Sequence, residues 1–156
     1  MAEFSVGVAR VTLSMPPSGK LTVRLLNQNV PAAVQSYLQP GEQLQNWAYG
    51  VKQPHVLLIA LTGAILTALL TKSYIVALTD RRLLVLRFEG ALKVSEVTEY
   101  PLSPPPQASG SRGMLFTRIR INDPAKPFVA KFHRMGMPNN RAHSTAILAA
   151  LTGVAA

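Results

Sequence analysis

Residues 74–88 read YIVALTDRRLLVLRF, two apolar runs joined by a short polar stretch. The polar stretch consists of Thr79, Asp80, Arg81 and Arg82. β-Forming runs around a short turn that contains Asp are typical of a β-hairpin. In this turn we expect Asp80 to accept backbone N–H groups and one arginine to bond nearby carbonyl oxygens. The stretch therefore predicts two antiparallel strands joined by a turn with a structural role.

Strand patterns continue on both sides of this hairpin. Residues 43–51 contain Trp47 and Tyr49 and lead toward a long apolar run, while residues 94–102 end just before three consecutive prolines. We therefore expect a strand in each range. Residues 104–113 are rich in Pro, Ser and Gly and lack periodicity, which predicts a mobile loop.

A second hairpin follows, and it carries the strongest functional signal. Inward, mainly apolar side chains alternate with outward ones along residues 114–121 (MLFTRIRI) and 128–134 (FVAKFHR). Each range therefore predicts a strand with one basic face. A turn centred between residues 124 and 125 would place Arg118 opposite Lys131. Like charges directly opposite each other destabilise a sheet by up to about 1 kcal/mol unless an anion lies between them.

The outward side chains of this hairpin are therefore candidate ligands for an anion. They are Arg118, Arg120, Lys131 and His133. Three interpretations are open at this point. A carboxylate of Glu96 or Glu99 on the preceding strand compensates the charge, an external phosphate does so, or the face is only solvated.

The N-terminal part of the chain mixes strand and helix patterns. Residues 4–13 and 21–26 contain β-forming residues on either side of a Pro- and Gly-containing turn, which predicts an N-terminal hairpin. Residues 30–38 predict a short helix, because Asn29 can cap it and Pro31 stands in its first turn.

The C-terminal part of the chain predicts an amphipathic helix over residues 139–152, capped by Asn139 or Asn140. Its apolar stripe consists of Ile147, Leu148 and Leu151. Antiparallel strands in series followed by one such helix predict a mainly β (α+β) fold, in which the helix covers the open side of a small antiparallel barrel.

Two short motifs resemble the bacterial pleckstrin-homology (PH)-like domain families. They are LQPGE at residues 38–42 and YIVALTDRRLL at residues 74–84, and the resemblance extends over residues 38–152. It implies a PH-like antiparallel barrel capped by a C-terminal helix, and a binding role more than a reaction. The basic loop between the first two strands of phosphoinositide-binding PH domains has no counterpart here, so inositol phosphate specificity is not implied.

The domain organisation follows from these assignments. We expect an N-terminal hairpin extension over residues 1–30 and a PH-like domain over residues 31–156. The domain would carry an apolar insertion at residues 55–71, between its early strands.

Composition narrows the range of partners. The 156 residues include 16 Lys and Arg against 7 Asp and Glu, which gives a formal net charge of +9. Such an excess attracts polyanions, either nucleic acid or anionic lipid. The hydrophobic content of 48% argues against a disordered chain. The absence of cysteine excludes disulfides, thiolate metal sites and cysteine nucleophiles.

The apolar run at residues 56–70 (VLLIALTGAILTALL) lies between Lys52 and Lys72. As a helix it would span roughly 22 Å at ~1.5 Å per residue, less than the about 30 Å of a bilayer core. It is either a buried core helix or hairpin, an interfacial or re-entrant segment, or a short membrane-spanning helix with its lysines at the headgroups. The residues expected at a membrane or subunit interface are Val56, Leu57, Leu58, Ile59, Leu61, Ile65, Leu66, Leu69 and Leu70.

The sequence carries no motif for catalysis or metal binding. The histidines are His55, His133 and His143, and no two have the spacing of metal ligands. Paired carboxylates, a nucleophile elbow and a phosphate-cradling glycine loop are also missing. We therefore expect no enzyme activity, no bound metal and no cofactor.

These observations favour a non-catalytic, membrane-associated PH-like module. It would engage anionic lipid through Lys52, Lys72 and the basic residues of the second hairpin, together with the apolar run. An alternative is a self-assembling or protein-binding PH-like domain with the apolar run in an oligomer interface. Nucleic-acid binding is a second, disfavoured alternative, because stacking aromatics do not alternate with the basic residues.

The expected location follows from the N-terminal residues. They lack the basic and apolar regions of a secretion signal. We therefore expect the protein at the cytoplasmic side of the membrane, attached peripherally or through a hairpin or single-helix anchor.

Overall fold

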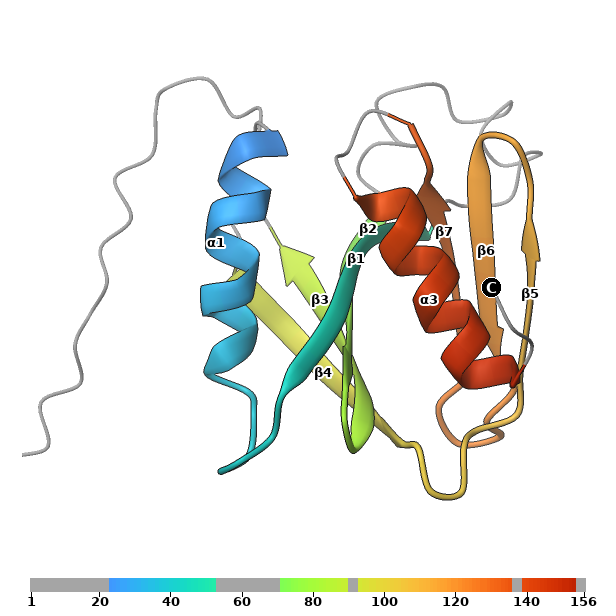
Figure 1. Cartoon of the computed structure of the whole chain (residues 1–156), viewed down its shortest axis with the longest axis horizontal. Helices are drawn as coiled ribbons and strands as arrows, with labels where there is room; N and C mark the ends of the chain where they lie inside the picture. The colour runs from blue at the N-terminus through green and yellow to red at the C-terminus, as the bar shows by residue number, and fades with distance from the viewer. Residues whose placement is uncertain (1–22, 53–70, 90–92, 136–138, 154–156) are drawn as a thin grey trace, which may run out of the picture.

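The computed structural model describes residues 23–52, 71–89, 93–135 and 139–153. In these ranges two helices and seven strands follow one another (Figure 1). Their order is α1 (Val23–Gln35), β1 (Leu44–Lys52), β2 (Lys72–Thr79), β3 (Arg82–Glu89), β4 (Lys93–Pro101), β5 (Ala108–Arg112), β6 (Phe116–Ile121), β7 (Phe128–His133) and α3 (Asn140–Thr152).

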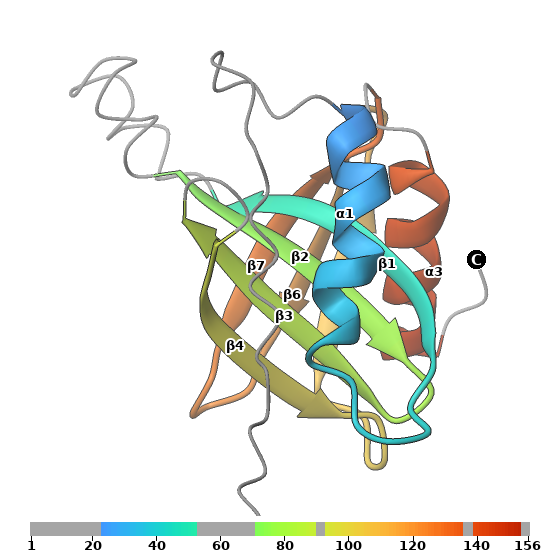
Figure 2. The ribbon, with the colours of Figure 1, turned by 90° about the vertical axis from the view of Figure 1, so that its left-hand side faces the viewer.

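The seven strands form one antiparallel sheet in the order β4-β3-β2-β1-β7-β6-β5. Strands β4 and β5 are its two edges and do not pair with each other in the described residues, so the predicted barrel is an open, bent sheet. The predicted class is confirmed: the described residues form a mainly β fold, with one antiparallel sheet and a C-terminal helix (Figures 1 and 2).

Helix α3 packs into the concave side of the sheet. Its predicted stripe is buried, with Ile147 fully covered and Leu148 and Leu151 only 7% and 4% exposed. Asn140 fixes the start of the helix: its side chain accepts from the Tyr49 N–H at 2.8 Å and donates to the carbonyl oxygens of Tyr49 and His133. Asn140 therefore ties α3 to β1 and β7, while Asn139 occupies the N-cap position without a side-chain cap bond.

Helix α1 covers the convex side of the sheet over β1, β2 and β3 (Figure 2). Val30 and Val34 are fully buried there, in a cluster with Ile75 and Leu84. The sequence-based assignment was wrong at this point, because residues 23–26 are helical rather than part of a strand, and Pro31 lies inside the helix. Short apolar runs fit either period, and packing against the sheet decides between them. The other residues of the predicted N-terminal hairpin lie outside the described ranges.

Strand β5 occupies half of the range predicted as a mobile loop, residues 108–112 of 104–113. Its residues, ASGSR, pair with β6 along its full length. Gly110 makes this possible, because a Cβ at that position would collide with the backbone oxygen of Arg118 and with the Leu148 side chain. Small residues that look like loop signals in the sequence therefore serve close packing here.

The turn between β2 and β3 is held by a buried ionic network. The Glu42 side chain is fully covered; it accepts from Thr79 Oγ1 at 2.7 Å and from Arg82 Nε and Nη2 at 2.9 and 2.8 Å. The hydrogen bond from Arg82 lowers the pKa of Glu42 to about 2. Arg82 also donates to the Tyr37 carbonyl, as predicted for an arginine of this turn. Asp80 accepts from the Gln43 N–H, outside the turn, and Thr79 Oγ1 instead of Asp80 accepts the turn N–H groups of Arg81 and Arg82.

Candidate anion-binding face

The basic residues of the second hairpin meet on one face, as predicted. Arg118 and Lys131 are directly opposite each other across β6 and β7, and Phe116 is opposite His133. Arg120 lies two residues farther along β6, opposite Val129. We call Arg118, Arg120, Lys131 and His133 the basic face. Its two arginines are exposed, and Lys131 and His133 are half-buried.

The alternation of β6 and β7 positions this face. The residues between its members point into the core, where Thr117, Ile119 and Phe132 are fully buried. The same pleat therefore turns Arg118 and Arg120 away from the core. Helix α1 packs on the convex side over β1–β3, and among the described residues no element packs over the basic face.

No described acidic side chain compensates the basic face. Glu96 and Glu99, the two candidates from the sequence, lie on β4 and form ion pairs with Arg87 and Arg82 instead. The sheet order separates β4 from β6 by four strands. The other described acids bond elsewhere: Glu42 to Arg82, Asp80 to Arg81, Glu89 to Arg87 and Asp123 to backbone N–H groups of its own turn. An external anion or solvent is thus the remaining partner.

An apolar rim adjoins the basic face. Met114, Leu115 and Met135 are 86%, 49% and 66% exposed, unusually high values for large apolar side chains. Met114 and Leu115 line a shallow hollow of about 410 Å³ together with Phe116, Arg118 and Lys131. We call Met114, Leu115 and Met135 the apolar rim. Basic and apolar groups therefore share one surface.

Backbone bonds fix the turn that carries the rim. The Gly113 N–H donates to the Phe116 carbonyl at 2.8 Å, and the Arg134 N–H donates to the Leu115 carbonyl at 3.0 Å. The Arg134 guanidinium also donates to the Gly113 carbonyl. The tip of the β5–β6 turn is thus joined to the end of β7, which keeps the rim beside the basic face.

His133 has a packed environment. Its ring contacts Phe116 edge-on, with 4.5 Å between the ring centroids. His143, one of the three histidines of the sequence, lies on α3 with its Nδ1 2.8 Å from the Trp47 carbonyl oxygen. In the described residues, no three His, Asp or Glu side chains gather closely enough to hold a metal ion.

Lys52 and Lys72 lie apart from the basic face. They pair with each other at the ends of β1 and β2, and both are exposed. Val51, the neighbour of Lys52, is opposite Lys131, so Lys52 points to the other side of the sheet. There it lines a hollow of about 260 Å³ with Arg87, Glu96 and Lys126. The six residues predicted to bind lipid or an anion thus form two groups.

The predicted interface segment, residues 56–70, lies outside the described residues. Among the helices that are described, none has the length and apolar character needed to cross a bilayer.

The apolar rim was not predicted from the sequence. Met114 falls within the strand predicted over residues 114–121, and Met135 lies just after the strand predicted over residues 128–134. Both methionines stand at the ends of predicted strands, but only the structure places the β5–β6 turn beside the end of β7.

The comparisons with known proteins concern the fold. No protein-family profile and no curated protein sequence matches the chain. Among solved structures, it is similar to the hSac2 domain from human phosphoinositide phosphatase Sac2, with 11% identity, a TM-score of 0.48, and coverage of 83% of this chain and 80% of that one. It is also similar to a pleckstrin homology domain from Shewanella amazonensis SB2B, with 15% identity, a TM-score of 0.38, and coverage of 82% and 95%. No binding residue is carried over from either.

Proposed function

We propose that this protein is a non-catalytic module that binds anionic lipid surfaces through the basic face and the apolar rim. The observation that carries the proposal is the group of Arg118, Arg120 and Lys131 without an acidic partner in the described residues, next to exposed Met114 and Leu115. An anionic leaflet, such as the cytoplasmic one, offers negatively charged headgroups to the basic face and an apolar layer to the rim.

The two groups act on different parts of the lipid. Guanidinium groups bond phosphate oxygens in pairs, and each cation near an anionic surface contributes about 1 kcal/mol. The methionine and leucine side chains would enter the boundary between headgroups and acyl chains. Neither contribution alone gives stable attachment, whereas the sum of several does. The apolar residues 56–70 would add to this attachment from a different part of the chain.

Vesicle co-sedimentation tests the proposal. The full chain is mixed with phosphatidylcholine vesicles, with or without about 30% phosphatidylglycerol to supply negative charge. Binding to the charged vesicles should fall as salt rises. The variant Arg118→Ala/Arg120→Ala/Lys131→Ala should lose about 3 kcal/mol of binding free energy.

A charge-matched control separates the face from net charge. Arg81, Lys93 and Lys126 are exposed and lie away from the basic face, so their replacement by alanine removes the same charge. The control variant should bind nearly as well as wild type. Equal losses in the two triple variants would show that overall charge, and not this face, directs binding, and unchanged binding in the first variant would contradict the proposal.

The apolar rim has its own variant. Met114→Ser/Leu115→Ser changes two exposed side chains outside the buried core, so the melting temperature should stay within a few degrees of wild type. Vesicle binding should fall while its salt dependence persists, because the cations remain. A loss of salt dependence instead would assign the binding to a different mechanism.

A further inference from the structure

Strand β5 leaves one row of backbone groups without a partner in the described residues. The Asn122 N–H donates to the Gln107 carbonyl, and the Gly113 N–H donates to the Phe116 carbonyl. Hydrogen bonding alternates along an antiparallel pair, so the residues that bond to β6 are the odd-numbered ones. The N–H and C=O groups of Ala108, Gly110 and Arg112 therefore face the open edge of the sheet.

The side chains along this edge are small. Ser109 and Ser111 alternate with Gly110, and all three are exposed. Proteins usually protect an edge strand with charged or bulky residues, proline or a bulge. Here the protection along the middle of β5 is slight, so an added strand can approach the backbone at the usual spacing of about 4.8 Å.

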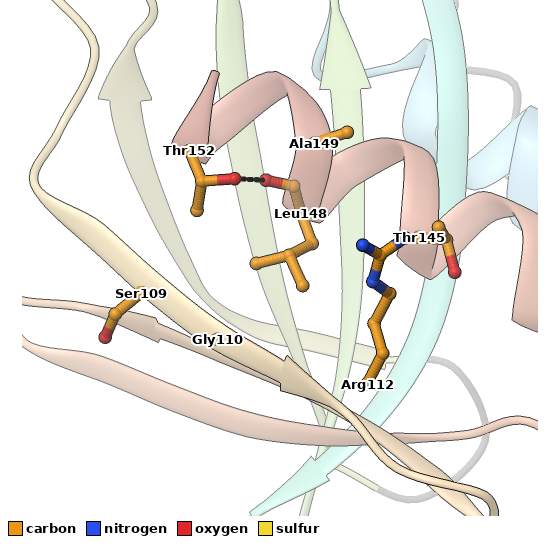
Figure 3. Close-up of a pocket in the computed structure, with 7 residues that line it drawn as sticks. All are labelled: Ser109, Gly110, Arg112, Thr145, Leu148, Ala149 and Thr152. Carbon is orange, nitrogen blue, oxygen red and sulfur yellow. Dashed lines mark hydrogen bonds between the residues drawn. The ribbon is translucent and has the colours of Figure 1, made fainter. Parts of the chain in front are cut away.

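A hollow lies beside the edge, between β5 and α3 (Figure 3). Its volume is about 300 Å³, and Arg112, Leu148, Ala149 and Thr152 are among the residues that line it. Thr152 donates its hydroxyl to the Leu148 carbonyl at 2.8 Å, which leaves an apolar floor at Leu148 and Ala149. Alternate side chains of an added strand would enter this hollow.

The charge of the hollow is positive. Figure 3 shows the Arg112 side chain extending from β5 toward Thr145 on α3. Arg112 forms no ion pair with a described acidic residue, and α3 itself contains no Asp or Glu. A partner with a carboxylate opposite Arg112 would thus meet attraction and no repulsion from the helix.

We propose that the β5 edge and the hollow beside α3 bind an extended, acidic peptide segment of a partner protein as an added strand. Main-chain bonds to Ala108, Gly110 and Arg112 supply affinity, and the Arg112 guanidinium selects an acidic side chain. This site is separate from the basic face, because Arg112 points to the concave side of the sheet and Arg118 to the convex side.

A defined peptide tests the site on the full chain. The probe is the acetylated, amidated heptapeptide Thr-Val-Glu-Val-Glu-Val-Thr, which is extended by composition and acidic. Titrated into ¹⁵N-labelled protein, it should shift the amide signals of Ala108, Gly110 and Arg112 saturably and slow their hydrogen exchange. A version with lysine in place of glutamate should bind about tenfold more weakly, and a version N-methylated on alternate residues should not bind.

Two variants of matched charge complete the test. Arg112→Glu should weaken binding of the acidic peptide about tenfold, whereas Lys93→Glu on the opposite edge strand should leave it unchanged. An absence of saturable shifts at β5 up to millimolar peptide would overturn the proposal, as would equal binding of the N-methylated peptide. Protection of the same amides in the free protein together with concentration-dependent dimerisation would assign the edge to a second copy instead.

Discussion

Replacement of Glu42 by glutamine tests the buried network that joins the two sequence motifs of the fold. Glu42 comes from LQPGE and Arg82 from TDRR, and four hydrogen bonds end on the Glu42 carboxylate: two from Arg82, one from Thr79 and one from the Gln39 N–H. The substitution keeps the shape of the side chain but removes its charge, which leaves the nearly buried Arg82 with only the half-exposed Glu99 as an ionic partner.

The size of the effect follows from the pKa of the carboxyl group. Its fall from 4.5 to about 2 corresponds to roughly 3 kcal/mol of stabilisation at neutral pH, at about 1.4 kcal/mol for each pKa unit. Losing one partner of a buried ion pair typically costs 3–5 kcal/mol, roughly the same amount. Glu42→Gln should therefore lower the free energy of unfolding by about 3 kcal/mol at neutral pH.

Urea denaturation followed by tryptophan fluorescence measures this difference, with Glu89→Gln as the control. Glu89 is exposed and pairs with Arg87 at 3.3 Å, so its substitution should cost less than about 1 kcal/mol. Because the folded-state pKa of Glu42 is depressed, its stabilisation is complete above pH 4.5 and is lost as pH falls toward 2. A Glu42→Gln variant within about 1 kcal/mol of wild type, or a gap that does not narrow in acid, would refute the reasoning.

Three further predictions concern the core, a tyrosine and the apolar insertion. Leu148→Asp places an unpaired charge against the sheet and should prevent cooperative unfolding by heat, as read by circular dichroism; a wild-type melting curve would mean that α3 is not docked. Burial raises the pKa of Tyr100 to about 12, so in ultraviolet titration one of the four tyrosines should ionise last, and stability should fall as pH rises from about 10 through 12; Tyr100→Phe should remove that late step. Replacing residues 55–71 with a short Gly/Asn turn should leave the domain folded, because β1 and β2 pair up to Lys52 and Lys72, and should weaken vesicle binding; failure to fold would assign the segment to the core.

The sequence predicted the strands whose pattern is strictly local. The hairpin of β6 and β7 has the predicted register, including Arg118 opposite Lys131, because alternation decides which face is buried and the turn centred between residues 124 and 125 sets the pairing. The stripe of α3 was predictable for the same reason, since its apolar spacing matches one face of a helix.

The errors fall where tertiary contacts override local preference. Residues 23–26 became helical because α1 packs on the sheet, and residues 108–112 became a strand because Gly110 lets β5 approach β6 and Leu148 closely. The ion pair between Glu42 and Arg82 joins residues 40 positions apart, so no local pattern could reveal it.

Only part of the candidate site could be predicted for a similar reason. The basic face follows from alternation within one hairpin, whereas its lack of acidic partners depends on sheet order, which separates it from Glu96 and Glu99. The apolar rim depends on the contact between the β5–β6 turn and the end of β7.

Paramagnetic relaxation measured on the lipid-bound protein tests the central claim most directly. The ¹⁵N-labelled protein is bound to nanodiscs of anionic lipid that carry a spin label at the headgroup, and the broadening of each amide signal is recorded. Binding through the basic face and the apolar rim predicts the strongest broadening at Met114, Leu115, Arg118 and Lys131, with little effect at Val34 on α1. Strongest broadening on α1, or none at the β5–β6 turn, would contradict the account.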